Sequence, residues 1–303
     1  MIKRTLCFSS PGRLRLHLRQ LIWQGEGEAA REASIPIEDI GLIIIESPLI
    51  SISAALLQSL SEALVAVVLC DRQHLPASVL LPQTAHTRVG KLLRLQLALT
   101  DAQKRKLWQL IIAAKIRNQA HVLASYSPEN ADHLKALAKQ VKRGDVQNRE
   151  AQAARLYFAS FPCGPTFHRE RFGDKLNAAL NYGYALLRAT VARALVASGL
   201  LPAIGLHHTN QYNHFPLADD LMEPYRPFVD QIVLSHIDAF TAPLEAPALT
   251  PENKRILLPF LTQDVFFGEA KRPLWNALLL TSASLARAMQ GRTEELIFPT
   301  PIV

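Results

Sequence analysis

The chain of 303 residues is 49% hydrophobic and 19% charged and has no long low-complexity tract, which excludes a disordered or fibrous protein and favours two domains over one. The net charge of +7 is unevenly distributed along the chain. Residues 1–84 hold seven basic and eight acidic residues, whereas residues 85–303 hold 26 basic and 18 acidic residues. A basic surplus confined to the second part indicates a polyanionic partner, most commonly nucleic acid, or else only a soluble basic surface.

The first 84 residues predict mainly β-structure. Short stretches, several rich in Ile and Val and separated by Gly, Pro, Asp or Ser, predict strands over residues 4–8, 13–18, 20–24, 41–47, 64–70 and 78–82. The stretch 51–64 has helical spacing and is expected to connect two of these strands.

From about residue 86 the hydrophobic period changes to about 3.6 residues, which indicates helices. They are predicted over residues 89–99, 101–124, 128–143, 148–161, 176–199, 217–237, 250–263 and 273–290. Capping residues support several of them, for example Thr100 and Thr250. The predicted fold class is therefore α+β. A small β-rich N-terminal domain, residues 1–84, is followed by a larger all-α domain, residues 85–303.

The chain shows no sign of a membrane or secreted protein. Its apolar stretches are too short or too interrupted to span a bilayer, and its start lacks the apolar core of a signal peptide. The three cysteines are scattered and form no CxxC pair, so neither a disulfide framework nor a zinc knuckle is expected. These features predict a cytoplasmic protein with no membrane partner.

The segment 205–227, GLHHTNQYNHFPLADDLMEPYRP, is the densest in groups that could bind a metal. His208 precedes a predicted helix on which Asp220 and Glu223 stand three residues apart and so share a face. One imidazole and one or two carboxylates suit a divalent cation. The alternative is that these acids only balance the helix dipole and that the histidines are ordinary loop residues. A zinc site built from His207, His208 and His214 is disfavoured, because neither HExxH spacing nor cysteine accompanies them.

A third ligand would have to come from elsewhere, and the best candidate is Glu150, in the first turn of the predicted helix 148–161. On spacing alone a dipole-balancing acid is the favoured interpretation of Glu150. The apolar helix 176–199 also carries polar residues that either fix packing or lie near a ligand: Asn177, Asn181, Tyr184 and Arg188.

Together these stretches resemble the CRISPR-associated spacer-integrating endonuclease, the integrase of CRISPR adaptation, and most closely the type that accompanies single-protein RNA-guided nucleases. The resemblance rests on IPIEDIGLIIIE, KIRNQA, GDVQNREAQAARLYF, NAALNYGYALLRATVARALVASGLLPAIGLHH and LADDLMEPYRPFVD. The stretch FPCGPTFHRERF departs from the family pattern, which leaves local DNA or loop contacts there undefined.

The resemblance implies a site and a reaction. Glu150, His208 and Glu223 correspond to the catalytic metal ligands, and Asp220 corresponds to a further acid that binds the metal or supports a ligand. The expected cofactor is Mg²⁺ or Mn²⁺. The expected enzyme is a metal-dependent endodeoxyribonuclease and DNA strand-transferase, which inserts short DNA duplexes as new spacers at the CRISPR repeat by phosphodiester transesterification and so serves antiviral defence.

The resemblance also implies an assembly. The N-terminal domain is expected to be β-sandwich-like and to form a homodimer. The dimer is expected to join a small ferredoxin-like adaptation partner in a heterohexamer that holds double-stranded DNA. Two rival interpretations remain open on the residues alone: a generic metal-dependent phosphoester hydrolase, and a non-enzymatic basic DNA-binding scaffold.

Overall fold

The computed structural model describes residues 3–26, 32–82, 86–163, 167–170, 173–241 and 249–302. The chain separates into two compact units, residues 1–87 and 88–303. The predicted boundary between residues 84 and 85 lies outside the described residues. Within the described ranges, no helix is both long enough and apolar enough to cross a membrane.

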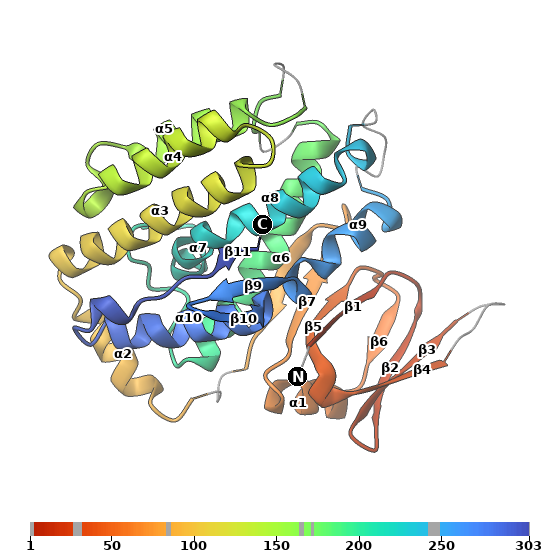
Figure 1. Cartoon of the computed structure of the whole chain (residues 1–303). Coiled ribbons are helices and arrows are strands. Elements are labelled where there is room, and N and C mark those ends of the chain that lie inside the picture. Colours follow the sequence, from red (N-terminus) through yellow and green to blue (C-terminus); the bar gives the residue numbers. More distant parts are fainter. Residues whose placement is uncertain are drawn as a thin grey trace. The chain divides into compact units, whose positions relative to one another are not determined.

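The first unit contains two four-stranded sheets (Figure 1). One has the order β1-β5-β7-β8, in which β1, β5 and β7 are parallel and β8 is antiparallel to β7. The other has the order β4-β3-β2-β6, in which β3 is antiparallel to both neighbours and β6 is parallel to β2. The strands are β1 (Arg4–Phe8), β2 (Gly12–His17), β3 (Gln20–Gly25), β4 (Glu32–Pro36), β5 (Ile40–Ile45), β6 (Ile50–Ile52), β7 (Ala66–Cys70) and β8 (Pro76–Leu80).

One hydrophobic core joins the two sheets of this unit. It combines residues of both sheets with residues of helix α1 (Ala54–Glu62), among them Leu14, Leu21, Ile43 and Leu56. Every residue of β5 is buried, as expected of a central strand whose apolar run does not alternate with polar residues. The Ser53 hydroxyl caps α1, which lies between β6 and β7 as a connecting helix.

The second unit is mostly helical, and the α+β fold class predicted from the sequence is confirmed. The helices are α2 (Val89–Leu97), α3 (Asp101–Leu123), α4 (Pro128–Gln140), α5 (Arg149–Ala159), α6 (Lys175–Ala197), α7 (Pro216–Met222), α8 (Arg226–Ser235), α9 (Pro251–Leu257) and α10 (Leu274–Ala288). Helix α3 packs against α4, α5, α7 and α8, and α6 packs against α7, α8, α9 and α10. These two long, largely buried helices therefore position most of the others.

Helices α6 and α8 approach each other closely at Gly183. A Cβ atom at this position would lie 2.4 Å from Val229 Cγ1. Any larger residue would force the Val229 side chain or the helix backbone to shift, because real Cβ atoms do not come that close to another carbon. The glycine thus lets the two helices bring their polar side chains to a common region.

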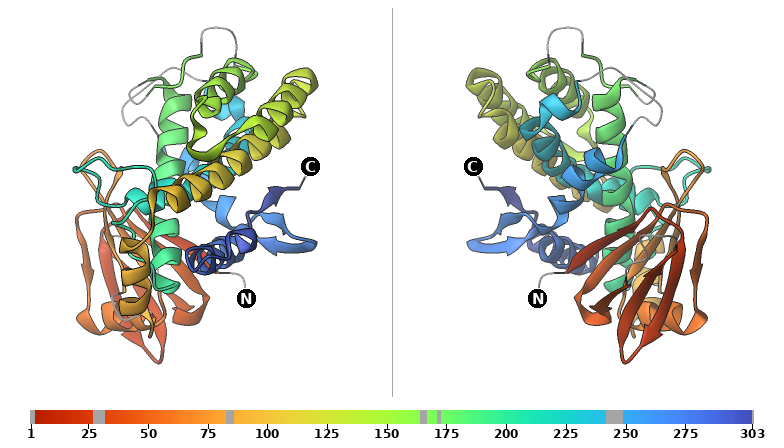
Figure 2. Two further views of the ribbon diagram at one scale, coloured as in Figure 1. Left: turned by 90° about the vertical axis from the view of Figure 1, so that its left-hand side faces the viewer. Right: turned by 90° about the vertical axis from the view of Figure 1, so that its right-hand side faces the viewer.

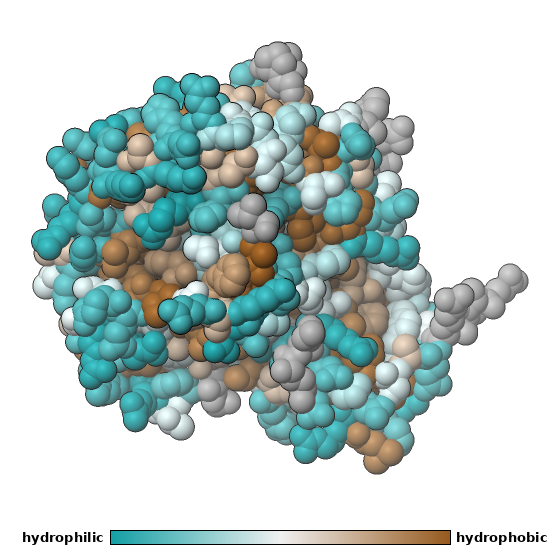
Figure 3. Space-filling model, viewed as in Figure 1, coloured by the Kyte–Doolittle hydropathy of each residue, from teal (hydrophilic) through white to brown (hydrophobic). Residues whose placement is uncertain are grey.

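A small sheet also belongs to the second unit, although the sequence predicted only helices there. Strands β9 (Asp264–Phe267), β10 (Ala270–Pro273) and β11 (Thr300–Pro301) pair in the antiparallel order β10-β9-β11. The sheet lies beside α10, and Figure 2 shows both in blue. Figure 3 shows hydrophilic residues over much of α4 and α5, and hydrophobic residues gathered nearer to α10 and this sheet.

Candidate active site

Glu150 lies in the first turn of α5, where a tight turn fixes its position. Gly144 precedes the helix with a φ of +73°, a left-handed conformation that favours glycine, and leads into the buried Asp145. The two carboxylate oxygens of Asp145 accept hydrogen bonds from the backbone N–H groups of Arg149 and Glu150, each at 2.9 Å. Free N–H groups of the helix end are thereby satisfied, and Glu150 is held by the turn before it.

Lys115 of α3 joins two of the acids predicted to bind metal. Its ammonium nitrogen Nζ is 2.6 Å from Glu150 Oε1 and 2.6 Å from Glu223 Oε2. The side chain of Lys115 is 11% exposed, that of Glu223 is 5% exposed and that of Glu150 is 28% exposed. The two carboxylates therefore converge on one cationic group, although Glu150 comes from α5 and Glu223 from the short 3₁₀ turn between α7 and α8.

A second cation stabilises the buried charge of Glu223. Arg226 Nε lies 2.9 Å from Glu223 Oε1. Burial alone would raise the pKa of Glu223, but the positive charges of Arg226 and Lys115 lower that pKa to about 2. For Lys115, burial acts to lower the pKa, but the charges of Glu223 and Glu150 outweigh it and leave the pKa raised. Glu223, Lys115 and Arg226 are therefore all charged at neutral pH.

The imidazole of His208 is oriented by the fully buried carboxylate of Asp220. Asp220 Oδ1 is 2.7 Å from His208 Nδ1 and accepts a hydrogen bond from His208 N at 3.1 Å. Asp220 Oδ2 accepts from Leu206 N at 2.5 Å and from His207 N at 3.1 Å. Because Asp220 occupies Nδ1, the other ring nitrogen, Nε2, is the one available to a ligand.

The same contact raises the pKa of His208. The hydrogen bond to Asp220 is the largest cause, burial opposes it, and the charges of Asp220 and Glu223 add to the rise. The influence of Glu223 indicates that His208 and Glu223 lie near enough for their charges to interact. Gly205 permits this loop geometry, because a Cβ there would lie 2.5 Å from His208 O and 3.2 Å from Asp220 Oδ2.

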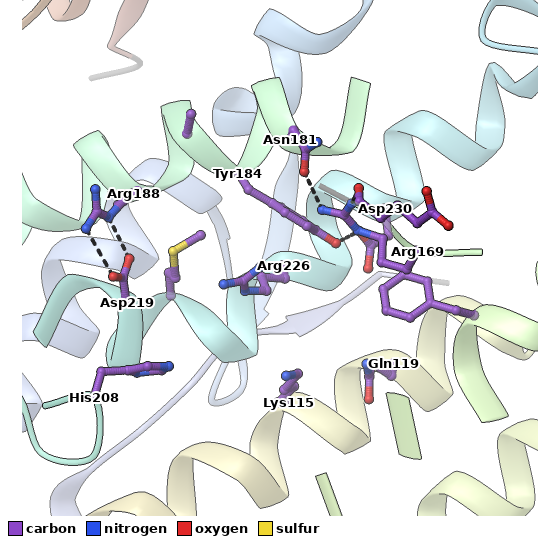
Figure 4. A pocket seen from close by; sticks show the side chains of 14 residues that line it. Lys115, Gln119, Arg169, Asn181, Tyr184, Arg188, His208, Asp219, Arg226 and Asp230 are labelled. Atoms are coloured by element: carbon purple, nitrogen blue, oxygen red, sulfur yellow. Dashed lines mark hydrogen bonds and ion pairs between the residues drawn. The ribbon is translucent and has the colours of Figure 1, made fainter. Parts of the chain in front are cut away.

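A cavity of about 740 Å³ adjoins these groups, and Figure 4 shows its lining. In that view Lys115 and Arg226 lie between His208 on one side and Arg169 on the other. Among the described residues that line it, the basic ones are Lys115, Arg169, Arg188 and Arg226. A polar hollow with several cations on its wall suits an anionic ligand such as phosphate.

Asp230 is a buried acid in the wall of this cavity. Its carboxylate accepts hydrogen bonds from Tyr157 Oη at 3.0 Å and from Tyr184 Oη at 2.5 Å. Burial raises the pKa of Asp230 to about 6, although the two tyrosine hydrogen bonds act to lower it. The rings of both tyrosines are thus fixed, and Tyr184 presents one face to the Arg226 guanidinium, 4.7 Å from the ring centre.

Of the four polar residues predicted on helix 176–199, three line the cavity and one, Asn177, does not. Asn177 is 1% exposed and accepts a hydrogen bond from Arg169 Nη1 at 2.9 Å, so it fixes the segment before α6. Arg169 Nη2 also donates to Asn181 Oδ1 at 2.6 Å. Arg188 pairs with Asp219, with Nε 2.6 Å from Oδ1. The residues of this set that line the cavity are Asn181, Tyr184 and Arg188.

The two carboxylates suit a hard divalent cation. Glu223 Oε2 is buried and accepts no hydrogen bond from any described residue, because its contact with Lys115 is an ion pair without hydrogen-bond geometry. Carboxylate oxygens are preferred ligands of Mg²⁺ and Mn²⁺, so this oxygen is chemically suited to such an ion. Across the described ranges, no three His, Cys, Asp or Glu residues are already gathered for one ion. Glu150 and Glu223 therefore fit the metal, and the addition of His208 as a third ligand stays a prediction.

Sequence reasoning missed the two cations that pair with Glu223. Lys115 was noted only within KIRNQA, and Arg226 was not singled out. A usable signal was present, because Lys115 shares the buried stripe of α3 with Trp108, Ile111 and Ile112 at helical spacing. A lysine on such a stripe requires a buried partner of opposite charge.

Replacing Asp220 with asparagine should lower the pKa of His208, because the hydrogen bond to this carboxylate is the largest cause of the rise. A raised histidine pKa stabilises the fold fully below the unfolded pKa of about 6.5, and the effect is lost as the pH rises through the folded pKa. This pH-dependent part of the stability should shrink in the variant. NMR titration of the His208 ring measures the shift. As a control, Asp219→Asn removes the partner of Arg188 and should change the pKa of His208 less. An unchanged His208 titration in Asp220→Asn would contradict the role assigned to Asp220.

Comparison with known proteins gives a consistent match. The profile of the family described as CRISPR associated protein Cas1 matches residues 6–257. The chain is 42% identical over 262 residues to a CRISPR-associated endonuclease Cas1 of Neisseria meningitidis serogroup C (strain 8013). That alignment covers 86% of this chain and 84% of the relative.

Solved structures share the fold. A casposase bound to integration product superposes with a TM-score of 0.78 at 21% identity, and the match covers 98% of this chain and 92% of that one. A chain of a Cas6-RT-Cas1–Cas2 complex matches with a TM-score of 0.72 at 20% identity. That match covers 98% of this chain but only 36% of the longer neighbour.

Proposed function

The chain belongs to the Cas1 family, and on that premise we propose that it is a metal-dependent DNA endonuclease and integrase of CRISPR adaptation. The observation that carries the proposal is the convergence of Glu150 and Glu223 on one cation beside a polar cavity whose wall includes four basic side chains. The name of the Neisseria relative describes an endonuclease, and the casposase carries an integration product, which supports a strand-transfer reaction at the same fold.

In the proposed reaction a DNA 3′-hydroxyl attacks a phosphodiester of the CRISPR repeat, and the leaving strand departs with its own 3′-hydroxyl. With water as the nucleophile, the same site cleaves DNA. Glu150, Glu223 and His208 would hold Mg²⁺ or Mn²⁺, which supplies charge stabilisation at the phosphate and orientation of the attacking oxygen. The nitrogen ligand favours Mn²⁺ in vitro.

The remaining residues of the site act by position and charge. Asp220 fixes the ring of His208 so that Nε2 faces a ligand. Arg169 lines the cavity, forms no ion pair with a described residue and would contact the phosphates of a bound strand, whereas Arg188 and Arg226 are already paired with Asp219 and Glu223. His208 could act alternatively as a proton donor to the leaving oxygen, because its raised pKa keeps a larger share of the ring protonated near neutral pH.

The proposed assembly follows the same premise. We expect a homodimer that joins a small ferredoxin-like partner in a heterohexamer and holds a short DNA duplex and the repeat. The Cas1–Cas2 assembly in the name of one structural neighbour supports a partner of this kind.

DNA affinity should fall steeply with salt and should reside in the second unit. Its basic surplus is the reason, because each neutralised phosphate releases counterions. If six or more phosphates are contacted, the affinity should drop by about 10³-fold or more between 50 and 200 mM salt. Fluorescence anisotropy of a labelled duplex measures this. A fragment of residues 1–87 that bound the duplex as tightly as the whole chain would contradict the assignment.

Dimerisation should depend on the first unit. Residues 1–84 carry almost no net charge, and a domain of this size buries a limited share of its surface, so it often relies on a partner. In sedimentation at micromolar concentration, the full-length protein should run as a dimer, whereas a fragment of residues 86–303 should run as a monomer or aggregate. A well-behaved dimer of that fragment alone would move the interface to the helical unit.

The proposed function is tested by an integration assay with a labelled short duplex and a supercoiled plasmid that carries the repeat. Strand transfer should require Mg²⁺ or Mn²⁺ and should stop when EDTA removes the metal. Products that persist in EDTA would exclude metal-dependent catalysis. A DNA-binding scaffold would give no product with or without metal, and a small-substrate hydrolase would cleave a small phosphodiester but leave DNA untouched.

A further inference from the structure

The Lys115 ammonium group lies where a bridging metal ion would have to approach. Glu150 Oε1 and Glu223 Oε2 are each 2.6 Å from Lys115 Nζ. An ion bonded to both oxygens at about 2.1 Å would lie within about 5 Å of that nitrogen. At such a distance in a largely buried site, a divalent cation and an ammonium repel each other strongly.

The charges of this cluster balance without a metal. The two carboxylates face two cations, Lys115 and Arg226, and the Arg226 contact uses the other oxygen of Glu223. Two of the other acids of the cavity wall have partners of their own, since Asp219 pairs with Arg188 and Asp230 accepts from two tyrosines, and the third, Glu170, is exposed to solvent. A divalent ion would therefore add two positive charges to a neutral buried cluster, which is unfavourable unless a cation leaves or an anion enters.

We propose that Lys115 is the counter-ion of the two carboxylates in the metal-free protein, and that a divalent cation must displace its ammonium group to bind. Lys115 is thus a positioning residue that keeps Glu150 and Glu223 together while no metal is present. Lys115 also couples the binding of the metal ion to the binding of DNA. A DNA phosphate brings the negative charge that the metal-loaded cluster requires, so the metal should bind more tightly with DNA than without it, and the reverse must also hold.

The inference rests on the proposed function, because it assumes that the two carboxylates bind the metal. Its test is calorimetric titration of the full-length protein with Mn²⁺, alone and with a short duplex whose 3′ ends are dideoxy-terminated and so lack the attacking hydroxyl. Wild-type protein should bind Mn²⁺ about tenfold more tightly with the duplex, within the usual range of coupling between two ligands. Lys115→Met should bind Mn²⁺ about tenfold more tightly than wild type without DNA, and its gain from DNA should be smaller.

The matched control is Lys135→Met. Lys135 pairs with Asp132 on the exposed surface of α4, so its removal should leave Mn²⁺ affinity and its coupling to DNA at wild-type values. Unchanged or weaker Mn²⁺ binding by Lys115→Met would overturn the inference. Failure of the proposed function would look different from failure of this inference. If the proposed function is wrong, wild-type protein will show no metal-dependent strand transfer, whatever the Mn²⁺ affinity of Lys115→Met.

A second measurement keeps the inference testable if Lys115→Met does not fold. The ¹H–¹⁵N signal of the Lys115 ammonium group can be followed in the wild-type protein and assigned by its absence in Lys115→Arg. Without metal the ion pairs should protect this group from exchange with solvent and make the signal visible. Saturating Mg²⁺ with the dideoxy duplex should shift or remove it, whereas an unchanged signal would overturn the displacement.

Discussion

Replacing His208 with alanine should abolish strand transfer and DNA cleavage while leaving folding and duplex binding nearly intact. Loss of a residue that merely supports a metal ligand lowers affinity or activity by about 10- to 100-fold, so loss of the proposed ligand itself should lower the rate by more than about 100-fold. The His208 side chain is 39% exposed, so the change removes little buried packing. Duplex affinity depends instead on many Lys and Arg contacts with phosphate.

The matched control is His207→Ala. His207 stacks on Trp108 at 4.1 Å between ring centres and stands outside the proposed ligand set, so its loss should leave most of the activity. Gel assays of integration and cleavage, with anisotropy for DNA binding, separate the two effects. Full integration by His208→Ala at physiological Mg²⁺ would refute the role of His208.

Replacing Glu223 with glutamine should eliminate activity and also destabilise the protein. The substitution leaves the Arg226 guanidinium without its only acidic contact among the described residues and takes one of two carboxylates from Lys115. Removal of one partner from a buried ion pair costs about 3–5 kcal/mol. Urea denaturation in EDTA measures this loss without any contribution from bound metal.

Glu150→Gln provides the matched comparison. Glu150 is 28% exposed and shares Lys115 with Glu223, so its loss leaves the lysine paired. It should eliminate activity as Glu223→Gln does, but its cost in stability should be nearer to about 1 kcal/mol, as for partly exposed pairs. Equal and small losses of stability in both variants would contradict the buried network around Glu223.

The longest helices followed from local pattern, whereas the helix predicted over residues 217–237 was wrong, because a 3₁₀ turn at Glu223–Tyr225 divides it into α7 and α8. Helix α3 was predicted over residues 101–124 and spans Asp101–Leu123, because a capping threonine and a long helical period mark it. The turn at Leu18 and Arg19 was missed: Leu18 was assigned to a strand, yet both residues have a positive φ, and no Asn-Gly or Asp-Gly signal marks the position. Strand β11 has two residues and pairs with the distant β9, so no local pattern could reveal it.

The site was predictable in its parts and not in its connections. The residue types of Glu150 and Glu223 and the first-turn position of Glu150 could be inferred from sequence, and the family resemblance selected both residues, but Glu223 lies in a 3₁₀ turn and not within the predicted helix. That one lysine would face both acids depends on the packing of α3 against α5 and against the turn after α7, which no spacing within a single helix encodes. The pairing of His208 with Asp220 likewise spans a loop whose shape depends on Gly205.

Glu150, His208 and Glu223 are expected to share one divalent ion. Anomalous X-ray diffraction from crystals of the full-length protein soaked in Mn²⁺ would locate this ion. We expect one strong anomalous peak about 2.0–2.3 Å from a carboxylate oxygen of Glu150, a carboxylate oxygen of Glu223 and Nε2 of His208, with the Lys115 ammonium displaced. A bound ion away from these three side chains, or no ion at them when Mn²⁺ supports strand transfer in solution, would contradict this expectation.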